Sequence, residues 1–113
     1  MGYVRQVGYG PVLRINEGEI LDMRSNTYYR IEGNFVYQNG RGVLYEISGN
    51  RIRDAFGGYL FEISGSNANK VFGGYHASFG GGYLKTHDQK EKFEVPSDLT
   101  MGQKLVAVAL LFS

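Results

Sequence analysis

Residues 45–60, YEISGNRIRDAFGGYL, decide the fold, because their pattern recurs on both sides at a period of sixteen. Three apolar columns and two glycine columns keep this spacing. The apolar columns are Leu13, Tyr29, Tyr45, Phe61 and Ala77; Ile15, Ile31, Ile47, Ile63 and Phe79; and Ile20, Val36, Ile52, Ala68 and Leu84. The glycine columns are Gly33, Gly49, Gly65 and Gly81, and Gly42, Gly58 and Gly74. Self-similarity at a fixed spacing of this size indicates a repeated supersecondary unit that packs against its neighbours.

Each unit contains two short runs of alternating residues and two turn signals. In residues 45–60 the turn signals are the segments 48–50, Ser-Gly-Asn, and 57–58, Gly-Gly. Glycine reaches positive φ without a steric penalty and asparagine tolerates it, so both segments suit tight hairpin turns. Two strands and two turns in sixteen residues leave about five residues for each strand, which is an ordinary strand length.

The alternation within the first run of each unit separates an apolar face from a polar one. Tyr45 and Ile47 share one face, and the opposite face carries Glu46, with Arg14, Arg30, Glu62 and Ser78 at the equivalent positions. This is the pattern of an antiparallel strand with one buried face. The second run differs, because a polar column, Asp22, Gln38, Asp54, Lys70 and Thr86, recurs on the side whose neighbours are apolar.

The repeat predicts the fold class. Residues 12–84 hold about four and a half units, or about nine strands. An open meander of that size would leave long unpaired edges, which proteins avoid by closing or covering the sheet. We therefore expect a mainly β fold of antiparallel β-hairpin repeats with four-fold pseudo-symmetry, closed or radially arranged.

The ends of the chain depart from the repeat, and the whole chain of 113 residues is expected to form one domain. Residues 1–11 are interpreted as a lead-in strand or arm and residues 85–96 as a charged connector with a last strand at 93–95. Residues 97–112 predict an α-helix. Ser97 or Thr100 can serve as its N-cap, and Thr100 with Gln103 fits a capping box. The helix is apolar on nearly all sides, so it must be buried within the fold or against a partner.

The phrases I-S-G-N-x-I and F-G-G, repeated at this period and followed by an apolar helix, resemble the small bacterial domain called the four-fold β-flower. The resemblance covers residues 12–112. It implies four pseudo-symmetric hairpin units. It supplies neither an activity nor catalytic residues.

Composition argues against several classes of function. The chain has no cysteine and a net charge of +1, with basic residues scattered rather than clustered, so we expect no nucleic-acid partner. The longest apolar run, residues 105–112, is far shorter than the ~20 residues that span a bilayer. No signal peptide is evident at the N-terminus. We therefore expect a cytoplasmic protein with no membrane contact.

Two histidines invite a chemical role. His76 stands in the column of Leu44 and Leu60, where a titratable ring replaces an aliphatic side chain. It could act as a ligand or an acid–base group in a cleft, but a half-exposed strand histidine is the favoured interpretation. His87 and Asp88 lie in the charged connector, where a solvated loop is favoured over a metal site. We expect no metal, no cofactor and no catalytic residue.

Two further sets of residues are candidates for binding. Tyr59 and Tyr75 are equivalent in the repeat and could present an aromatic face to a sugar, a peptide or a protein, although core packing is favoured for the tyrosines. If the units surround an axis, Asp22, Gln38, Asp54 and Lys70 converge. They would then form a structural network, with Asp54 paired to Lys70, or line a small polar pocket.

The leading functional hypothesis is a non-enzymatic interaction or accessory module whose partner is unknown. The alternative is a small-ligand or carbohydrate-binding domain that uses the tyrosines and the polar column. The apolar helix also favours a homodimer with contacts through Leu111 and Phe112. In the competing arrangement, the β-units close around the helix and leave a monomer.

Overall fold

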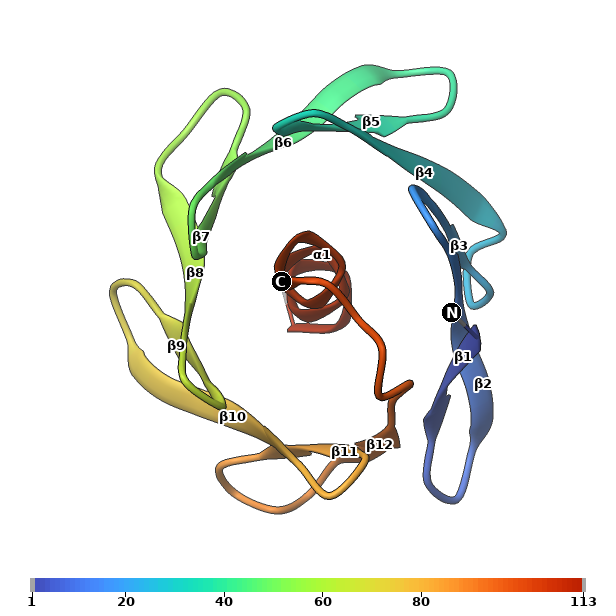
Figure 1. Cartoon of the computed structure of the whole chain (residues 1–113), viewed down its shortest axis with the longest axis vertical. Coiled ribbons are helices and arrows are strands. Elements are labelled where there is room, and N and C mark those ends of the chain that lie inside the picture. Colours follow the sequence, from blue (N-terminus) through green and yellow to red (C-terminus); the bar gives the residue numbers. More distant parts are fainter. Residues whose placement is uncertain (1, 113) are drawn as a thin grey trace.

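The structure, a computed structural model, describes residues 2–112. Twelve antiparallel strands form a closed barrel around a single helix, α1, Met101–Phe112 (Figure 1). The strands are β1 Gly2–Gln6, β2 Gly10–Asn16, β3 Glu19–Asp22, β4 Thr27–Glu32, β5 Phe35–Gln38, β6 Gly42–Ser48, β7 Arg51–Asp54, β8 Tyr59–Ser64, β9 Asn67–Lys70, β10 Gly74–Gly80, β11 Tyr83–Thr86 and β12 Lys92–Glu94. The expected fold class, closed antiparallel hairpins with one C-terminal helix, is confirmed.

The barrel closes through the two segments that lie outside the recognised repeat. β1 pairs with β2 on one side and with β12 on the other, where Arg5 lies opposite Glu94 and Gln6 opposite Phe93. The lead-in segment is therefore a strand of the wall rather than a free arm. Closure gives the backbone groups at both edges of the sheet hydrogen-bond partners. The open edges that an unclosed meander would have are thereby removed.

The barrel contains more units than the sequence analysis counted. Its twelve strands make six pairs, against the four units and about nine strands that were expected. One column of completely buried residues has a member in each of the six strand pairs: Val4, Ile20, Val36, Ile52, Ala68 and Leu84. Phe93 of β12 likewise continues the column of Leu13. The last unit was missed because the β11–β12 turn has no glycine, whereas the first unit keeps Gly8 and Gly10, which are equivalent to Gly40 and Gly42 and were not matched to the repeat.

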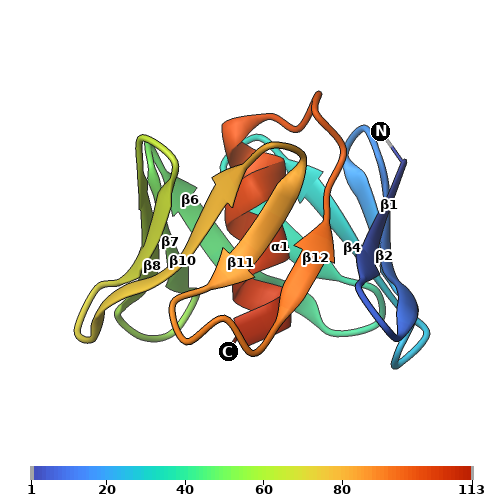
Figure 2. The ribbon, with the colours of Figure 1, turned by 90° about the horizontal axis from the view of Figure 1, so that it is seen from below.

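α1 lies inside the barrel, with strands around it on all sides (Figures 1 and 2). Leu105, Val106, Ala107, Val108 and Ala109 are all completely buried, although they point in every direction around the helix. An eight-stranded barrel is just filled by its own side chains, so twelve strands enclose a wider interior that needs further filling. The helix, which is apolar on all sides, fills this interior, and the β-units close around it.

The start of α1 is fixed by a capping box and by a bond to the wall. The backbone N–H of Gln103 donates to Thr100 Oγ1 at 3.2 Å, and the backbone N–H of Thr100 donates to Gln103 Oε1 at 2.8 Å. Thr100, rather than Ser97, is thus the N-cap residue. Gln103 Nε2 also donates to the carbonyl of Glu17 at 2.7 Å, which ties the first turn of the helix to the β2–β3 turn.

A β-bulge recurs around the wall. The pairing register shifts opposite Val12, Leu44, Leu60 and His76, each of which is an extra residue in its strand. Val12 is completely buried, and Leu44 and Leu60 pack against the core. The bulge thus adds a core side chain on these strands. β3 and β4 pair without a shift, and Tyr28, which holds the equivalent position, is 45% exposed.

Truncation of an α1 side chain inside the lumen should lower the free energy of unfolding as much as a core truncation does in any globular domain. Leu105→Ala is expected to lower the free energy of unfolding by about 2–5 kcal/mol, because the surrounding wall cannot collapse into the cavity. Met101→Ala, on the exposed first turn of the same helix, is the control and should change stability by less than about 0.5 kcal/mol. Denaturant titration measures both; equal losses would contradict the enclosed position of α1.

The turn glycines should be sensitive through backbone strain alone. Gly49 has a φ of 62°, and an added Cβ there would have no neighbour within 4 Å. Gly49→Val is expected to lower the free energy of unfolding by about 1–2 kcal/mol. Gly80 has equally open surroundings but no positive φ, so Gly80→Val is the matched control and should cost less. Equal melting temperatures for the two variants would rule out strain as the cause.

Candidate functional site at the mouth of the barrel

The candidate residues gather at one end of the barrel, where α1 ends. We call this end the C-terminal mouth; it is formed by the loops 7–9, 23–26, 39–41, 55–58, 71–73 and 87–91 (Figure 2). Because consecutive strands are antiparallel, every second loop of the barrel returns to this end. The polar column lies on the short strands directly before these loops, and for that reason its members share one end of the barrel.

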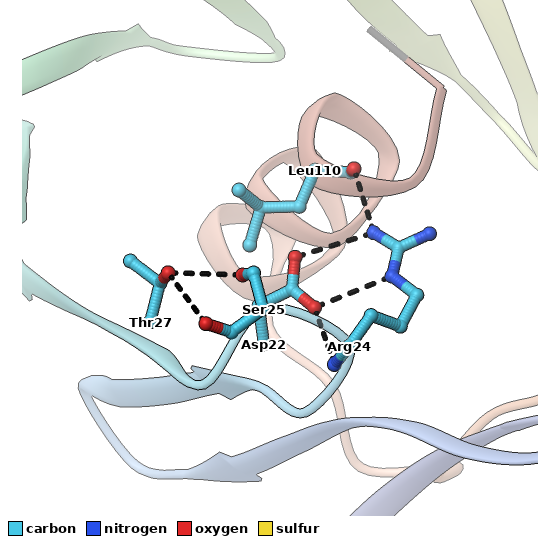
Figure 3. A network of polar contacts seen from close by, with 5 residues as sticks. All are labelled: Asp22, Arg24, Ser25, Thr27 and Leu110. Carbon is cyan, nitrogen blue, oxygen red and sulfur yellow. Dashed lines mark hydrogen bonds and ion pairs between the residues drawn. The ribbon is translucent and has the colours of Figure 1, made fainter.

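Asp22 and Arg24 hold the end of the helix (Figure 3). Arg24 donates from Nε to Asp22 Oδ1 and from Nη2 to Asp22 Oδ2, both at 3.2 Å. The same Nη2 donates to the carbonyl oxygen of Leu110 at 3.1 Å. The last carbonyls of a helix have no partner within the helix and carry partial negative charge, so a guanidinium there is favourable. Asp22, which is only 7% exposed, thus orients the arginine that caps α1.

Other members of the polar column hold the loops. Asp54 Oδ1 accepts a hydrogen bond from the backbone N–H of Phe56 at 2.9 Å. Thr86 Oγ1 donates to Asp88 Oδ1 at 2.7 Å, and it accepts from the backbone N–H of Glu91 at 3.1 Å. Short polar side chains of this kind stabilise turns by bonding to the backbone a few residues further on. The backbone N–H of Lys90 and the Thr86 hydroxyl lower the pKa of the Asp88 carboxyl.

The expected pair between Asp54 and Lys70 is not formed among the described residues. Asp54 is on β7 and Lys70 on β9, with the whole of β8 between them. Two strand spacings amount to about 9–10 Å, which is too far for an ion pair unless both side chains lean together. In the register, Asp54 lies opposite Tyr45 and Lys70 opposite Phe61, so aromatic residues alternate with the polar column around the mouth.

His76 lies in the lumen at this mouth. As the bulge residue of β10, its ring makes edge contacts with Phe112 and Phe61, at centroid distances of 4.6 Å and 6.1 Å. Burial lowers its pKa, and the charge of Lys70 lowers it further, against an opposing effect of Asp88 and Glu91. A cavity of 220 Å³ next to the ring is lined by Tyr75, His76, Thr86, His87, Asp88 and Glu91.

Tyr59 and Tyr75 do not lie on neighbouring strands of the wall. They are on β8 and β10, which are separated by β9. Tyr59 lies under the guanidinium of Arg51, with 5.5 Å between the carbon and the ring centroid, and Tyr75 makes an edge contact of 4.8 Å with His87. Cations also lie over the rings of Tyr3, Tyr37 and Tyr83. Of the described tyrosines, Tyr45 is buried in the core and Tyr29 packs against it, whereas Tyr3, Tyr9, Tyr28 and Tyr75 are exposed.

Two features of the structure were missed by the sequence analysis. The first is a cavity of 520 Å³, here called the tyrosine cavity, which is lined by Glu19, Tyr28, Tyr29, Arg30, Tyr37, Gln38, Asn39, Gly40 and Gly42. Of the candidate residues, it contains Gln38 only. A signal was present, since three tyrosines fall within ten positions and Tyr28 breaks the aliphatic bulge column. Burial raises the pKa of the Tyr29 phenol, and the charge of Asp22 adds to this effect.

The second missed feature is an apolar rim on the C-terminal mouth. Phe56 and Phe72 are 94% and 91% exposed at the tips of neighbouring loops. Tyr9, Val7 and Met23 are exposed on other loops of the same mouth. The sequence contains no separate signal for them, because a repeat with many apolar positions does not show which of them fall on loop tips.

Within residues 2–112, no group of three or more His, Cys, Asp or Glu side chains could hold a metal ion. None of the described helical structure is long and apolar enough to cross a membrane. Comparison with protein-family models, with curated proteins and with solved structures gave no match to this chain. A proposal of function therefore depends on the geometry.

The depressed pKa of His76 should make stability depend on pH. Because the folded chain disfavours the imidazolium, the unfolded chain binds more protons once the pH falls below its ordinary pKa of 6.5. The free energy of unfolding should fall in that range. His76→Leu, which restores the residue found at positions 44 and 60, should lose this component and gain stability at about pH 5 relative to the native protein.

The control is His87→Gln, which removes the neighbouring histidine and leaves the contact between His76 and Phe112 in place. It should keep the pH dependence of the native protein. Denaturant titrations at about pH 5 and about pH 7.5 measure both variants. An unchanged pH dependence in His76→Leu would show that protonation of His76 is not coupled to folding.

Proposed function

We propose that this chain is a non-enzymatic interaction module that binds a protein partner through the apolar rim of its C-terminal mouth. The observation that carries the proposal is the exposure of Phe56 and Phe72, two large aromatic side chains that contribute almost nothing to the core. Contiguous exposed apolar residues are uncommon on monomers and mark contact surfaces. Aromatic residues are also the side chains that most often supply the binding energy of protein interfaces.

The two phenylalanines lie on neighbouring loops of the frame. The β7–β8 and β9–β10 loops are neighbours at the mouth, and a Cβ added at Gly58 would lie 4.0 Å from the ring of Phe72. The ring of Phe72 therefore lies within contact distance of the β7–β8 loop. Asp54 fixes the β7–β8 loop through the N–H of Phe56 itself. Such an arrangement reduces the entropy lost on binding, because the anchor residues start from closely spaced loops on a closed barrel.

The partner that fits this rim is a protein surface with an apolar pocket for two aromatic rings. Arg24, Lys70 and Asp54 near the same mouth would supply a polar border, as is usual around an aromatic anchor. We include in the proposal that the chain is related to the four-fold β-flower domains, supported by the hairpin repeat and the C-terminal helix, with six strand pairs in place of the four units that the resemblance implies. A bacterial origin and a cytoplasmic location belong to the same proposal.

Self-association is a separate part of the proposal. Leu111 and Phe112 are half-buried at the C-terminal mouth, and the ring of Phe112 lies 5.8 Å from that of Phe93. A second copy that covered the rim could reach both residues without displacement of α1. The homodimer expected from the sequence therefore stays a prediction.

The test compares three forms of the full chain in cross-linking from native lysate: the native protein, the double variant Phe56→Ser/Phe72→Ser and the control Phe35→Ser. Phe35 is 41% exposed at the start of β5, at the opposite end of the barrel. A partner captured by the native protein and the control, and lost from the double variant, must then bind the purified native chain with the same dependence. Equal capture by all three forms would overturn the proposal.

Light scattering of the same three proteins identifies a second copy as the partner. A mass of two chains, each of 12.6 kDa, that falls to one in the double variant would assign the rim to self-association. A mass of one chain for every form would end the homodimer prediction and leave a different protein as the partner.

A further inference from the structure

We propose that the tyrosine cavity is a binding site for a neutral saccharide, separate from the apolar rim. The cavity has a volume of 520 Å³, within the range of about 300–1,000 Å³ typical of small-molecule sites. Its lining combines three tyrosines with a few polar side chains. This combination is typical of sites in which aromatic surface supplies contact area and polar groups fix the orientation of the ligand.

The register of the strands brings most of this lining together on the outer wall. Glu19 of β3 lies opposite Arg30 of β4, and Arg30 lies opposite Tyr37 of β5, so these three form a row across neighbouring strands. Tyr28 is on the same side of β4 as Arg30, because it is two residues away. The unshifted pairing of β3 with β4 keeps Tyr28 on this side, whereas a bulge adds a core residue at the equivalent position of other units.

The loop after β5 leaves the cavity open. Gly40 and Gly42 both have positive φ, at 85° and 88°, and a Cβ at either position would have no neighbour within 4 Å. The backbone N–H of Asn39 donates to the carbonyl oxygen of Tyr28 at 2.9 Å, which ties the loop to β4. The loop thus forms a fixed wall with no side chains at two of its positions, and a ligand can approach its backbone.

The charges in the cavity favour an uncharged ligand. The only cation in its lining, Arg30, is paired with Glu32 at 2.7 Å and lies 5.6 Å from the ring centroid of Tyr37. Glu19 adds a negative charge to the lining. An anion would therefore meet one neutralised guanidinium and one carboxylate, and it would have to compete with Glu32 for Arg30. This arrangement disfavours phosphorylated ligands and acidic sugars.

The polar groups that have no partner match the needs of a sugar. Within residues 2–112, the side chains of Glu19, Gln38 and Asn39 make no hydrogen bond or ion pair, although all three line the cavity. The carboxylate accepts hydrogen bonds, and each amide both donates and accepts. Neighbouring hydroxyl groups of a saccharide require that mixture. The faces of Tyr28 and Tyr37 offer apolar surface for the C–H face of a sugar ring, and their hydroxyl groups stay polar at the edge.

The experiment is a titration of the isotope-labelled full chain with maltose, cellobiose and chitobiose, followed by backbone amide shifts in NMR spectra. The expected result is a saturable change at millimolar concentrations of at least one of these sugars, confined to residues 19, 28–30 and 37–42. Tyr37→Ala should weaken that binding about tenfold or more, and Glu19→Gln should weaken it while the fold is unchanged. Amide spectra of each variant show whether it is folded.

The matched control is Tyr83→Ala. Tyr83 is also a half-buried strand tyrosine with a cation over its ring, Lys92 at 4.1 Å, but it lies outside the tyrosine cavity. The Tyr83→Ala variant should bind the sugar as the native protein does. The double variant Phe56→Ser/Phe72→Ser should also bind normally, so this test and the test of the rim succeed or fail independently.

Three outcomes would overturn the proposal. These are no saturable change with any of the three sugars, changes that lie outside the tyrosine cavity, or equal loss of binding in Tyr37→Ala and Tyr83→Ala. Titrations with glucuronic acid and inorganic phosphate complete the experiment. Binding of either at the tyrosine cavity in preference to the neutral sugars would overturn the assigned ligand class.

Discussion

The structure depends on the fit between a twelve-stranded barrel and the helix inside it. A closed sheet of this size encloses more space than its own inward side chains can fill, and an empty lumen would leave their apolar faces in contact with water or with a void. α1 fills that space with residues that are apolar in every direction. The helix in turn has no other place in the fold where all its faces could be buried. Barrel and helix therefore stabilise each other, because neither could bury its apolar side chains without the other.

Both ends of the helix are fixed to the wall by polar groups, and the apolar contacts lie between them. At the start, Gln103 satisfies the backbone of Thr100 and the carbonyl of Glu17 with one side chain. At the end, Arg24 bonds to the carbonyl of Leu110 and is oriented by Asp22. Apolar burial has little directional preference, so these bonds set how deep and at which rotation the helix lies. The position of Phe112 against His76 follows from this arrangement.

Two places where the regular repeat breaks its own pattern carry candidate sites. The bulge column is aliphatic at Val12, Leu44 and Leu60, where it adds to the core. It becomes His76 in one unit, where a titratable ring enters the lumen, and Tyr28 in another, where the bulge is absent and an exterior cavity lies beside the ring. The apolar rim depends instead on a feature that the repeat keeps, because Phe56 and Phe72 are equivalent positions on loops outside the hydrogen-bonded wall. Phe56 and Phe72 can be exposed there without any effect on the register of the strands.

The sequence by itself determined the hairpin unit and the capped apolar helix, because each follows from local chemistry: alternation and turn glycines for the first, Thr100 with Gln103 for the second. It left open whether the sheet was closed or radially arranged. It did not determine the number of units, since β12 keeps the core residue Phe93 but follows a turn without glycine, and Gly8 and Gly10 after β1 were not matched to Gly40 and Gly42. Nor could it separate Asp54 from Lys70, or bring Tyr28, Tyr37 and Glu19 into one cavity. Those relations depend on strand order and on the register of each pair. Only tertiary structure decides them, because one bulge residue or one intervening strand changes which side chains meet.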